Sequence, residues 1–128
     1  MPSIIDKALQ QCFLDSVKLK KLWQNASPAS SFSAQTITIA GLNEYDLYAI
    51  LYTPIKGENS YMVAFGKPGY ASYLITVAKA AYGRRYISRS NAEEITFGNG
   101  SYNNADGENY QIPLIVYGLK ILSGGVLN

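Results

Sequence analysis

The feature that most constrains the fold is a series of short β-type runs separated by turn residues, and residues 22–52 show it best. From Gln35 to Ile39 polar and apolar side chains alternate, so the isoleucines share one face and the threonines the other, as a half-buried strand requires. From Leu47 to Tyr52 the chain is almost continuously apolar, which favours a strand covered on both faces, since six residues are few for a helix. This stretch therefore predicts strands joined by polar turns.

Runs of the same kind continue along the chain. Each is rich in β-branched or aromatic residues and is bounded by turn-forming residues. They cover residues 61–65, 72–78, 84–89, 95–97 and 111–119. A helix over residues 71–82 is the main alternative, and residues 98–109 are expected to form a long polar loop. About seven or eight strands at this spacing indicate a mainly β fold, an antiparallel β-sandwich or jelly roll.

Residues 3–16 carry a different pattern. Three apolar residues fall at helical spacing and would form a stripe along one face: Ile5, Leu9 and Phe13. We expect a short amphipathic helix here, with residues 1–21 as a helical connector and residues 22–128 as the β-sandwich domain. Because an isolated helix of this length is marginal in water, the stripe must be buried, either on this domain's sheet or in a helical bundle between subunits. In a bundle, these three residues would drive oligomerisation.

Composition excludes several classes of protein. The length of 128 residues suits one domain, and 48% hydrophobic against 16% charged residues is too apolar for disorder. The net charge of +2 arises from 11 basic and 9 acidic residues spread along the chain, so nucleic acid is not an expected partner. Cys12 is the single cysteine and cannot form a disulfide within the chain, and no apolar run is long enough for membrane insertion.

The chain contains no histidine, which removes the usual general base, the Ser–His and Cys–His nucleophile pairs and the commonest zinc ligand. We therefore predict a protein without catalytic residues, without a metal site and without a cofactor. A glycosidase with two carboxylates stays open as an alternative. The available acidic pairs, each in an expected turn, are Glu44/Asp46, Glu93/Glu94 and Asp106/Glu108.

Two further polar clusters allow ligand binding but also have a simpler structural explanation. The loop over residues 98–109 offers oxygen ligands suited to calcium, although its spacing differs from an EF-hand and a solvated loop explains it more simply. Those ligands would be Asn103, Asn104, Asp106 and Glu108. The second cluster predicts a strand with one basic face, which serves either as an anion-binding patch or as charge that guards a sheet edge. Its members are Arg84, Arg85 and Arg89.

The aromatic composition is unbalanced, with 11 tyrosines against four phenylalanines and one tryptophan. Tyrosine combines a large contact area with a hydroxyl that tolerates water. Five tyrosines cluster in the middle of the chain: Tyr61, Tyr70, Tyr73, Tyr82 and Tyr86. If they share a face they can stack on sugar rings, whereas packing in the core or between subunits is the alternative. Trp23 is interpreted as a core anchor.

Three segments of the chain resemble a known family. They are LWQNASPASSFSAQTITIAGLNEYDLYAILY (22–52), GRRYISRSNAEEITFGNGSYNN (83–104) and IPLIVYGLK (112–120). These motifs resemble C-terminal domains of structural proteins from tailed bacteriophages and prophages, of the tail-fibre, head-fibre or baseplate receptor-binding type. The resemblance implies a β-sandwich on an oligomeric, often trimeric, virion appendage. It carries over no ligand-binding residues.

Together these patterns predict a viral protein that is made in the host cytoplasm and becomes part of the virion. Its expected partners are other copies of itself, as a homotrimer, and either a host cell-surface glycan such as a cell-wall polysaccharide or another virion protein. The alternative is a purely structural domain that caps or decorates a fibre and binds no ligand. A small glycan-active hydrolase is the third hypothesis.

Overall fold

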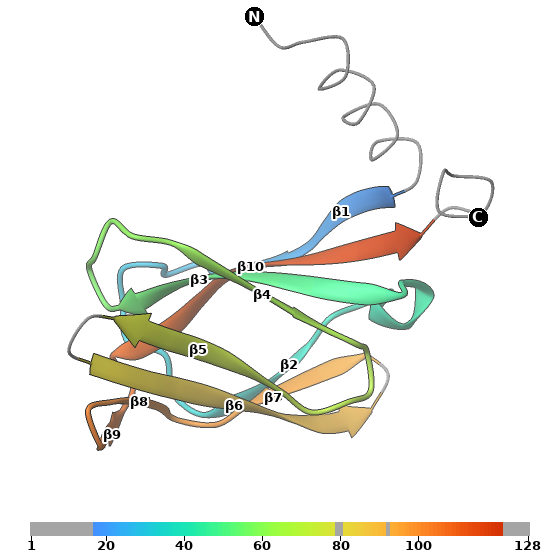
Figure 1. Cartoon of the computed structure of the whole chain (residues 1–128). Coiled ribbons are helices and arrows are strands. Elements are labelled where there is room, and N and C mark those ends of the chain that lie inside the picture. The colour runs from blue at the N-terminus through green and yellow to red at the C-terminus, as the bar shows by residue number, and fades with distance from the viewer. Residues whose placement is uncertain (1–16, 79–80, 92, 122–128) are drawn as a thin grey trace, which may run out of the picture.

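The computed structural model describes residues 17–78, 81–91 and 93–121. The fold is mainly β and antiparallel, as the sequence predicts, with two four-stranded sheets that face each other in a sandwich-like arrangement (Figure 1). Sheet A contains, in order, β1 (Val17–Gln24), β10 (Tyr110–Ile121), β3 (Leu47–Ile55) and β4 (Met62–Gly66). Sheet B contains, in order, β2 (Gln35–Thr38), β7 (Glu94–Phe97), β6 (Ala81–Asn91) and β5 (Ser72–Ala78). The helix expected over residues 3–16 lies outside the described residues.

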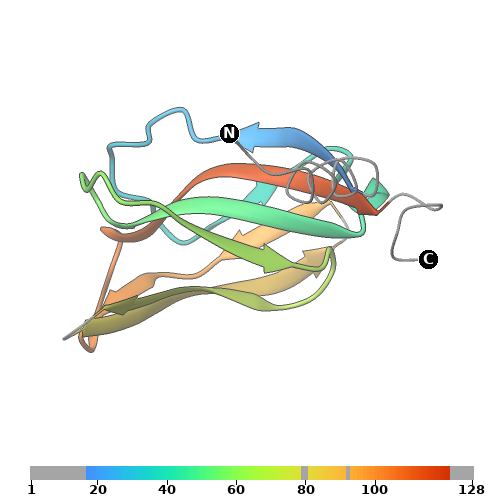
Figure 2. The ribbon, with the colours of Figure 1, turned by 45° about the horizontal axis from the view of Figure 1, so that its top comes forward.

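The chain crosses repeatedly between the two sheets, so each sheet combines distant segments. β3 and β4 form a hairpin in sheet A, whereas β5, β6 and β7 follow one another in sheet B. β10 returns from far along the chain to lie between β1 and β3. The edge strands β4 and β5 lie on the same side of the molecule (Figure 2). The alternative helix over residues 71–82 is wrong, because β5 and the start of β6 occupy that segment.

β1 spans the expected boundary between connector and domain at residue 21, so residues 17–21 belong to sheet A. One element differs from that expected. The expected loop over residues 98–109 contains a hairpin of β8 (Gly100–Tyr102) and β9 (Ala105–Gly107). Its turn residues, Asn103 and Asn104, have φ angles of 50° and 67°. A two-residue hairpin turn needs this left-handed conformation, and asparagine tolerates it better than most residues.

Side chains from the facing surfaces of both sheets form one core. Sheet A contributes Tyr48, Ile50, Tyr52 and Val116, and sheet B contributes Leu74, Ile87, Ile95 and Phe97. Phe32, from the connection between β1 and β2, packs edge-on against Phe97 with ring centroids 5.3 Å apart. Trp23 lies half-buried against the same core, 6.4 Å from the Phe32 ring, which agrees with its interpretation as an anchor.

Arg85 is completely buried in this core, with 0% of its surface exposed. Its guanidinium donates three hydrogen bonds to backbone carbonyls: from Nε to Gln111 at 2.8 Å, from Nη1 to Gly98 at 2.6 Å and from Nη2 to Tyr110 at 2.7 Å. Burial lowers the pKa of Arg85 to about 10, which the Glu108 charge partly offsets, so the group stays charged at neutral pH. Neighbouring residues of a strand point to opposite faces, so Arg84 is exposed while Arg85 points into the core. The prediction that the arginines share one basic face is therefore wrong.

Gln111 extends this buried network from β10. Its amide nitrogen donates to Thr76 Oγ1 at 3.1 Å and to the Ser101 carbonyl at 2.9 Å, and its amide oxygen accepts from the Ser101 backbone at 3.1 Å. Its φ of 44° lies in the left-handed region, which costs roughly 1–3 kcal/mol for a residue that is not glycine. The hydrogen bonds offset this strain and hold β8 against the rest of the sandwich.

Candidate ligand-binding surface on sheet B

The outer face of sheet B carries a band of exposed aromatic and apolar side chains over β5 and β6. Alternation along the strands turns Leu74 and Thr76 inward and their neighbours outward. The antiparallel register then places the outward residues opposite one another, as the pairs Tyr73/Tyr86, Ile75/Arg84 and Val77/Tyr82. We call these six residues the Tyr/Arg surface. It is the largest grouping of the predicted tyrosines that the described strands bring together.

Within the Tyr/Arg surface, aromatic rings and a guanidinium lie side by side. The ring centroids of Tyr73 and Tyr86 are 5.1 Å apart, with a tilt of 45° between the rings. The guanidinium carbon of Arg84 lies 5.0 Å from the Tyr73 centroid, in a cation–π arrangement. Tyr82 is the most open of the three tyrosines, with 63% of its surface exposed. The surface thus presents aromatic faces for stacking next to planar hydrogen-bond donors.

Hydroxyl groups continue the outer face of sheet B beyond the Tyr/Arg surface. Ser88 in β6 is paired with Thr96 in β7, which in turn is paired with Thr36 in β2. The Oγ1 atoms of Thr36 and Thr96 are hydrogen-bonded at 2.9 Å. The outer face of sheet B therefore changes from aromatic to hydroxyl-bearing across the sheet, a combination suited to a ligand that is itself amphipathic.

The hairpin of β8 and β9 supports this surface from the side of β6. The Ser101 hydroxyl accepts from the Arg84 amide and donates to the Arg84 carbonyl, both at 3.0 Å, and the Asn103 amide donates to the Tyr82 carbonyl at 2.9 Å. Gly83 lies where the two backbones meet, and a Cβ placed on it would be 1.8 Å from the Ser101 carbonyl oxygen. The backbone that presents Tyr82 and Arg84 is consequently held on both edges, by β5 and by β8.

The other two predicted tyrosines lie elsewhere. Tyr70 belongs to the loop between β4 and β5, where its ring lies 5.0 Å from the Lys67 amine. Tyr61 precedes β4 and lines a separate pocket of about 240 Å³ with Pro28 and Glu58. Sequence reasoning missed Ile75 and Val77 as members of the surface, although the alternation within residues 72–78 placed them on the same face as Tyr73.

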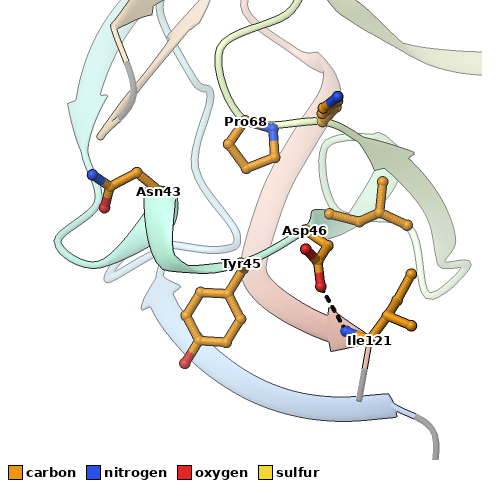
Figure 3. A pocket seen from close by; sticks show the side chains of 7 residues that line it. Asn43, Tyr45, Asp46, Pro68 and Ile121 are labelled. Atoms are coloured by element: carbon orange, nitrogen blue, oxygen red, sulfur yellow. Dashed lines mark hydrogen bonds between the residues drawn. The ribbon is translucent and has the colours of Figure 1, made fainter. Parts of the chain in front are cut away.

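A more concave site lies at the end of the sandwich where β1 begins and β10 ends (Figure 3). This pocket of about 680 Å³ is lined by Asn43, Tyr45, Asp46, Leu47, Lys67, Pro68 and Ile121. The Asp46 carboxylate accepts a hydrogen bond from the Ile121 amide at 2.7 Å, so it ties η1 (Leu42–Glu44) and the start of β3 to the end of β10. The Asp46 carboxylate therefore already has a hydrogen-bond partner within the fold, and the residues that line this pocket do not include a cluster of aromatic side chains.

The remaining predicted sites are dispersed. Asn103 and Asn104 form the hairpin turn, which explains their presence without a metal. Within residues 17–78, 81–91 and 93–121, no three residues of the types His, Cys, Asp or Glu are grouped closely enough to hold a metal ion. Over the same residues, no helix has the length and apolar character needed to cross a membrane.

Comparison with known proteins does not identify a family for this chain. No protein-family profile matches the sequence, and no curated protein is significantly similar to it. The resemblance to phage structural proteins therefore stays a prediction, and the function must be argued from the surface itself.

Proposed function

We propose that this chain is a non-enzymatic domain of a phage virion appendage and that it binds a host cell-surface glycan through the Tyr/Arg surface. The observation that carries the proposal is the placement of Tyr73, Tyr82, Tyr86 and Arg84 on one exposed sheet face, with the Tyr73 and Tyr86 rings 5.1 Å apart and the Arg84 guanidinium 5.0 Å from the Tyr73 ring. The segments that resemble phage appendage domains support the setting, and the absence of histidine from the sequence supports binding without turnover.

The chemistry of the Tyr/Arg surface suits a polysaccharide. The C–H face of a sugar ring can stack on an exposed tyrosine ring, while the guanidinium of Arg84 donates to hydroxyl or acidic groups of neighbouring sugars. One such site would bind weakly, because it is open to water along its whole length. A homotrimer on an appendage would present the surface several times to one cell wall, and multivalency raises avidity by a factor on the order of 10²–10⁴.

A structural domain that caps or decorates a fibre is the second candidate. Ile75 and Val77 favour it, since they place aliphatic side chains within the Tyr/Arg surface, where a protein partner would exclude water more completely than a glycan. A glycan-active hydrolase would need two carboxyl groups across a cleft, about 5–10 Å apart. The acidic pairs singled out above lie in and after η1, at the start of β7, and in and after β9, and none of their members belongs to the Tyr/Arg surface.

Binding to purified cell walls tests the proposal. We expect the full chain to co-sediment with cell walls from susceptible bacteria, and Tyr82→Ala or Tyr86→Ala to weaken binding by about tenfold or more, as for an anchor residue. Tyr61→Ala is the matched control, because it removes an equally exposed tyrosine on another part of the molecule. Equal binding by all four proteins would reject the surface as the site, and release of reducing sugar would favour the hydrolase.

A further inference from the structure

The outer face of sheet A differs chemically from that of sheet B. The strand register aligns its outward residues in rows that cross the sheet. One row joins Leu19, Leu119 and Leu47, and the next joins Lys21, Tyr117, Ala49 and Phe65. A third row joins Gln24, Ile115, Leu51 and Val63. The polar exceptions in these rows, Lys21 and Gln24, lie on the edge strand β1 and are hydrogen-bonded to each other at 2.9 Å.

A face of this kind is unusual for an outer sheet surface. Antiparallel sheets with one solvated face usually alternate apolar residues inward and polar residues outward. Here Tyr48, Ile50 and Val116 already fill the inward positions, yet the outward positions between them are apolar as well. Leu19 and Phe65 leave 59% and 60% of their surfaces exposed. Exposure of this apolar area to water is unfavourable, so we expect another segment or another molecule to cover the face.

The area of this face indicates whether a second copy of the chain or a single helix packs against it. Four strands at about 4.8 Å and three rows at about 6.8 Å give a face of roughly 400 Å². A stable dimer buries about 800 Å² on each partner, so a second copy seated on this face alone would form a weak contact. A helix of residues 3–16 would be about 21 Å long, which matches the width of the four strands. One amphipathic helix therefore fits the face better than another sandwich does.

The path of the chain brings such a helix to the face. Residues 3–16 join β1 at Val17, which is paired with Ile121 at the end of β10. The row of Leu19, Leu119 and Leu47 lies beside this point, and Leu47 and Ile121 also line the pocket of about 680 Å³ at the same end (Figure 3). A segment tethered so closely has a high effective concentration at the face, which a separate molecule lacks.

We propose that residues 3–16 of the same chain form an amphipathic helix that lies across the outer face of sheet A, with Ile5, Leu9 and Phe13 against it. The apolar stripe of the helix is then used within the subunit and not in a helical bundle between subunits. Sheet A is closed by this segment, while the Tyr/Arg surface on sheet B stays open. The proposal is independent of the proposed function, because it concerns where residues 3–16 pack and not what Tyr82, Tyr86 and Arg84 bind.

The single native cysteine makes this proposal directly testable, because Cys12 lies on the stripe side of the predicted helix between Leu9 and Phe13. In the full chain, Leu119→Cys places a second thiol on the face of sheet A. Mild oxidation at micromolar protein concentration should form a disulfide within one chain, identified by its faster migration on a non-reducing gel and by peptide mass. The matched control is Val77→Cys, a more exposed position on sheet B.

We expect the disulfide within the Leu119→Cys chain to form at least ten times faster than in the Val77→Cys chain. Leu47→Cys, which is paired with Leu119 in the same row of the face, serves as a second variant if Leu119→Cys disturbs the fold, and the same ratio is expected for it. Disulfides that join two chains would overturn the proposal in favour of a second copy. Equal rates at the sheet A and sheet B positions would overturn it as well.

Discussion

Arg85 and Gln111 occupy the centre of the sandwich, where most domains place aliphatic side chains. Each of their hydrogen-bonding groups has a partner on another segment, from β5, β8, β10 or the turn before β8. A satisfied buried network of this kind fixes one arrangement of the strands, because a shifted register would leave several groups without partners. These two residues therefore determine where the hairpin of β8 and β9 lies, and with it the backbone behind Tyr82 and Arg84.

Replacing Arg85 tests this role. Arg85→Met keeps much of the side-chain volume but leaves three backbone carbonyls without a donor, so the free energy of unfolding should fall by about 3 kcal/mol or more. Arg84→Met, one residue away on the exposed face, should change it by less than about 0.5 kcal/mol. Urea denaturation of both variants measures the difference. Similar losses in the two variants would contradict a structural role for the buried guanidinium.

Ionisation of buried groups predicts how stability depends on pH. Burial raises the pKa of Tyr48 and of Tyr52 above the ordinary value of 10.0, so the stability that their neutral forms contribute is lost as the pH rises above 10. Burial lowers the pKa of Arg85 from its ordinary value to about 10, so the penalty of burying its charge is present below pH 10 and is relieved as the pH rises above 10. None of the three groups changes charge between pH 6 and 8.

Unfolding of a tyrosine variant at several pH values separates these contributions. Tyr52→Phe removes a hydrogen bond to the Ile75 carbonyl and should cost about 1 kcal/mol at neutral pH. The same variant should lose less stability than the parent between pH 9 and 11, because it has one buried phenol fewer. A parallel loss in both proteins over this range would show that Tyr52 does not take part in alkaline unfolding.

The burial of Arg85 could not have been predicted from the sequence. Alternation states that Arg84 and Arg85 point to opposite faces, but it does not state which of them faces the core. The deciding partners are carbonyls of Gly98, Tyr110 and Gln111, which only the folded chain brings to β6. The positive φ of Gln111 was equally hidden, because nothing local to a Gln-Ile-Pro sequence requires it.

At the scale of elements, the hairpin of β8 and β9 links the core to the candidate site. It pairs with neither main sheet over its full length, yet β8 bonds to β6 through Ser101 and to β10 through the side chain of Gln111. The close approach of β8 to β6 requires a residue without a side chain at Gly83.

Substituting alanine at Gly83 should displace this hairpin. The added Cβ would meet backbone and not a flexible side chain, so we expect a loss of at least about 2 kcal/mol in the free energy of unfolding and weaker glycan binding through Tyr82. Gly98→Ala is the matched control, since its Cβ would meet atoms no nearer than 3.5 Å. Thermal unfolding and cell-wall sedimentation of both variants provide the measurements. If Gly83→Ala were as stable as the control, the tight packing of β8 on β6 would be refuted.

Most strands follow from local pattern, whereas the hairpin and the sheet order do not. The alternation of residues 35–39 and the apolar run of residues 47–52 predict β2 and β3, and both lie where expected. The Asn103-Asn104 pair contained a turn signal, but it was hidden in a segment rich in other turn residues. The interior position of β10 depends on pairing with β1 and β3 across long sequence distances, which periodicity does not report.

For the whole molecule, the main finding is that the two outer faces differ in chemistry. Sheet A presents a mainly apolar face next to the start of β1, and sheet B presents tyrosine, arginine and hydroxyl groups. The sequence predicted the cluster of tyrosines, and the structure gathers Tyr73, Tyr82 and Tyr86 because β5 and β6 form a hairpin. Tyr61 and Tyr70 fall in loops, so nearness in sequence did not bring them to the same face.

The proposed packing of residues 3–16 on sheet A predicts a specific response to Leu9→Asp. A charge in the stripe should release residues 3–16 from sheet A, so labelling of the Cys12 thiol should become at least tenfold faster while the mass by light scattering stays the same. Lys7→Asp, which lies off the stripe, should leave the labelling rate unchanged. A fall in mass on Leu9→Asp would instead support a helical bundle between subunits.

The most direct test of the central claim is a titration of the ¹⁵N-labelled full chain with soluble fragments of cell-wall polysaccharide, followed by amide chemical shifts. Binding through the Tyr/Arg surface predicts that the largest shifts lie in β5 and β6, around Tyr73, Tyr82 and Tyr86, and that sheet A changes little. Shifts centred on sheet A or on the pocket beside Asp46 would contradict this claim. The absence of shifts at millimolar glycan would also contradict it, provided that the fragments come from a cell wall with which the intact chain co-sediments.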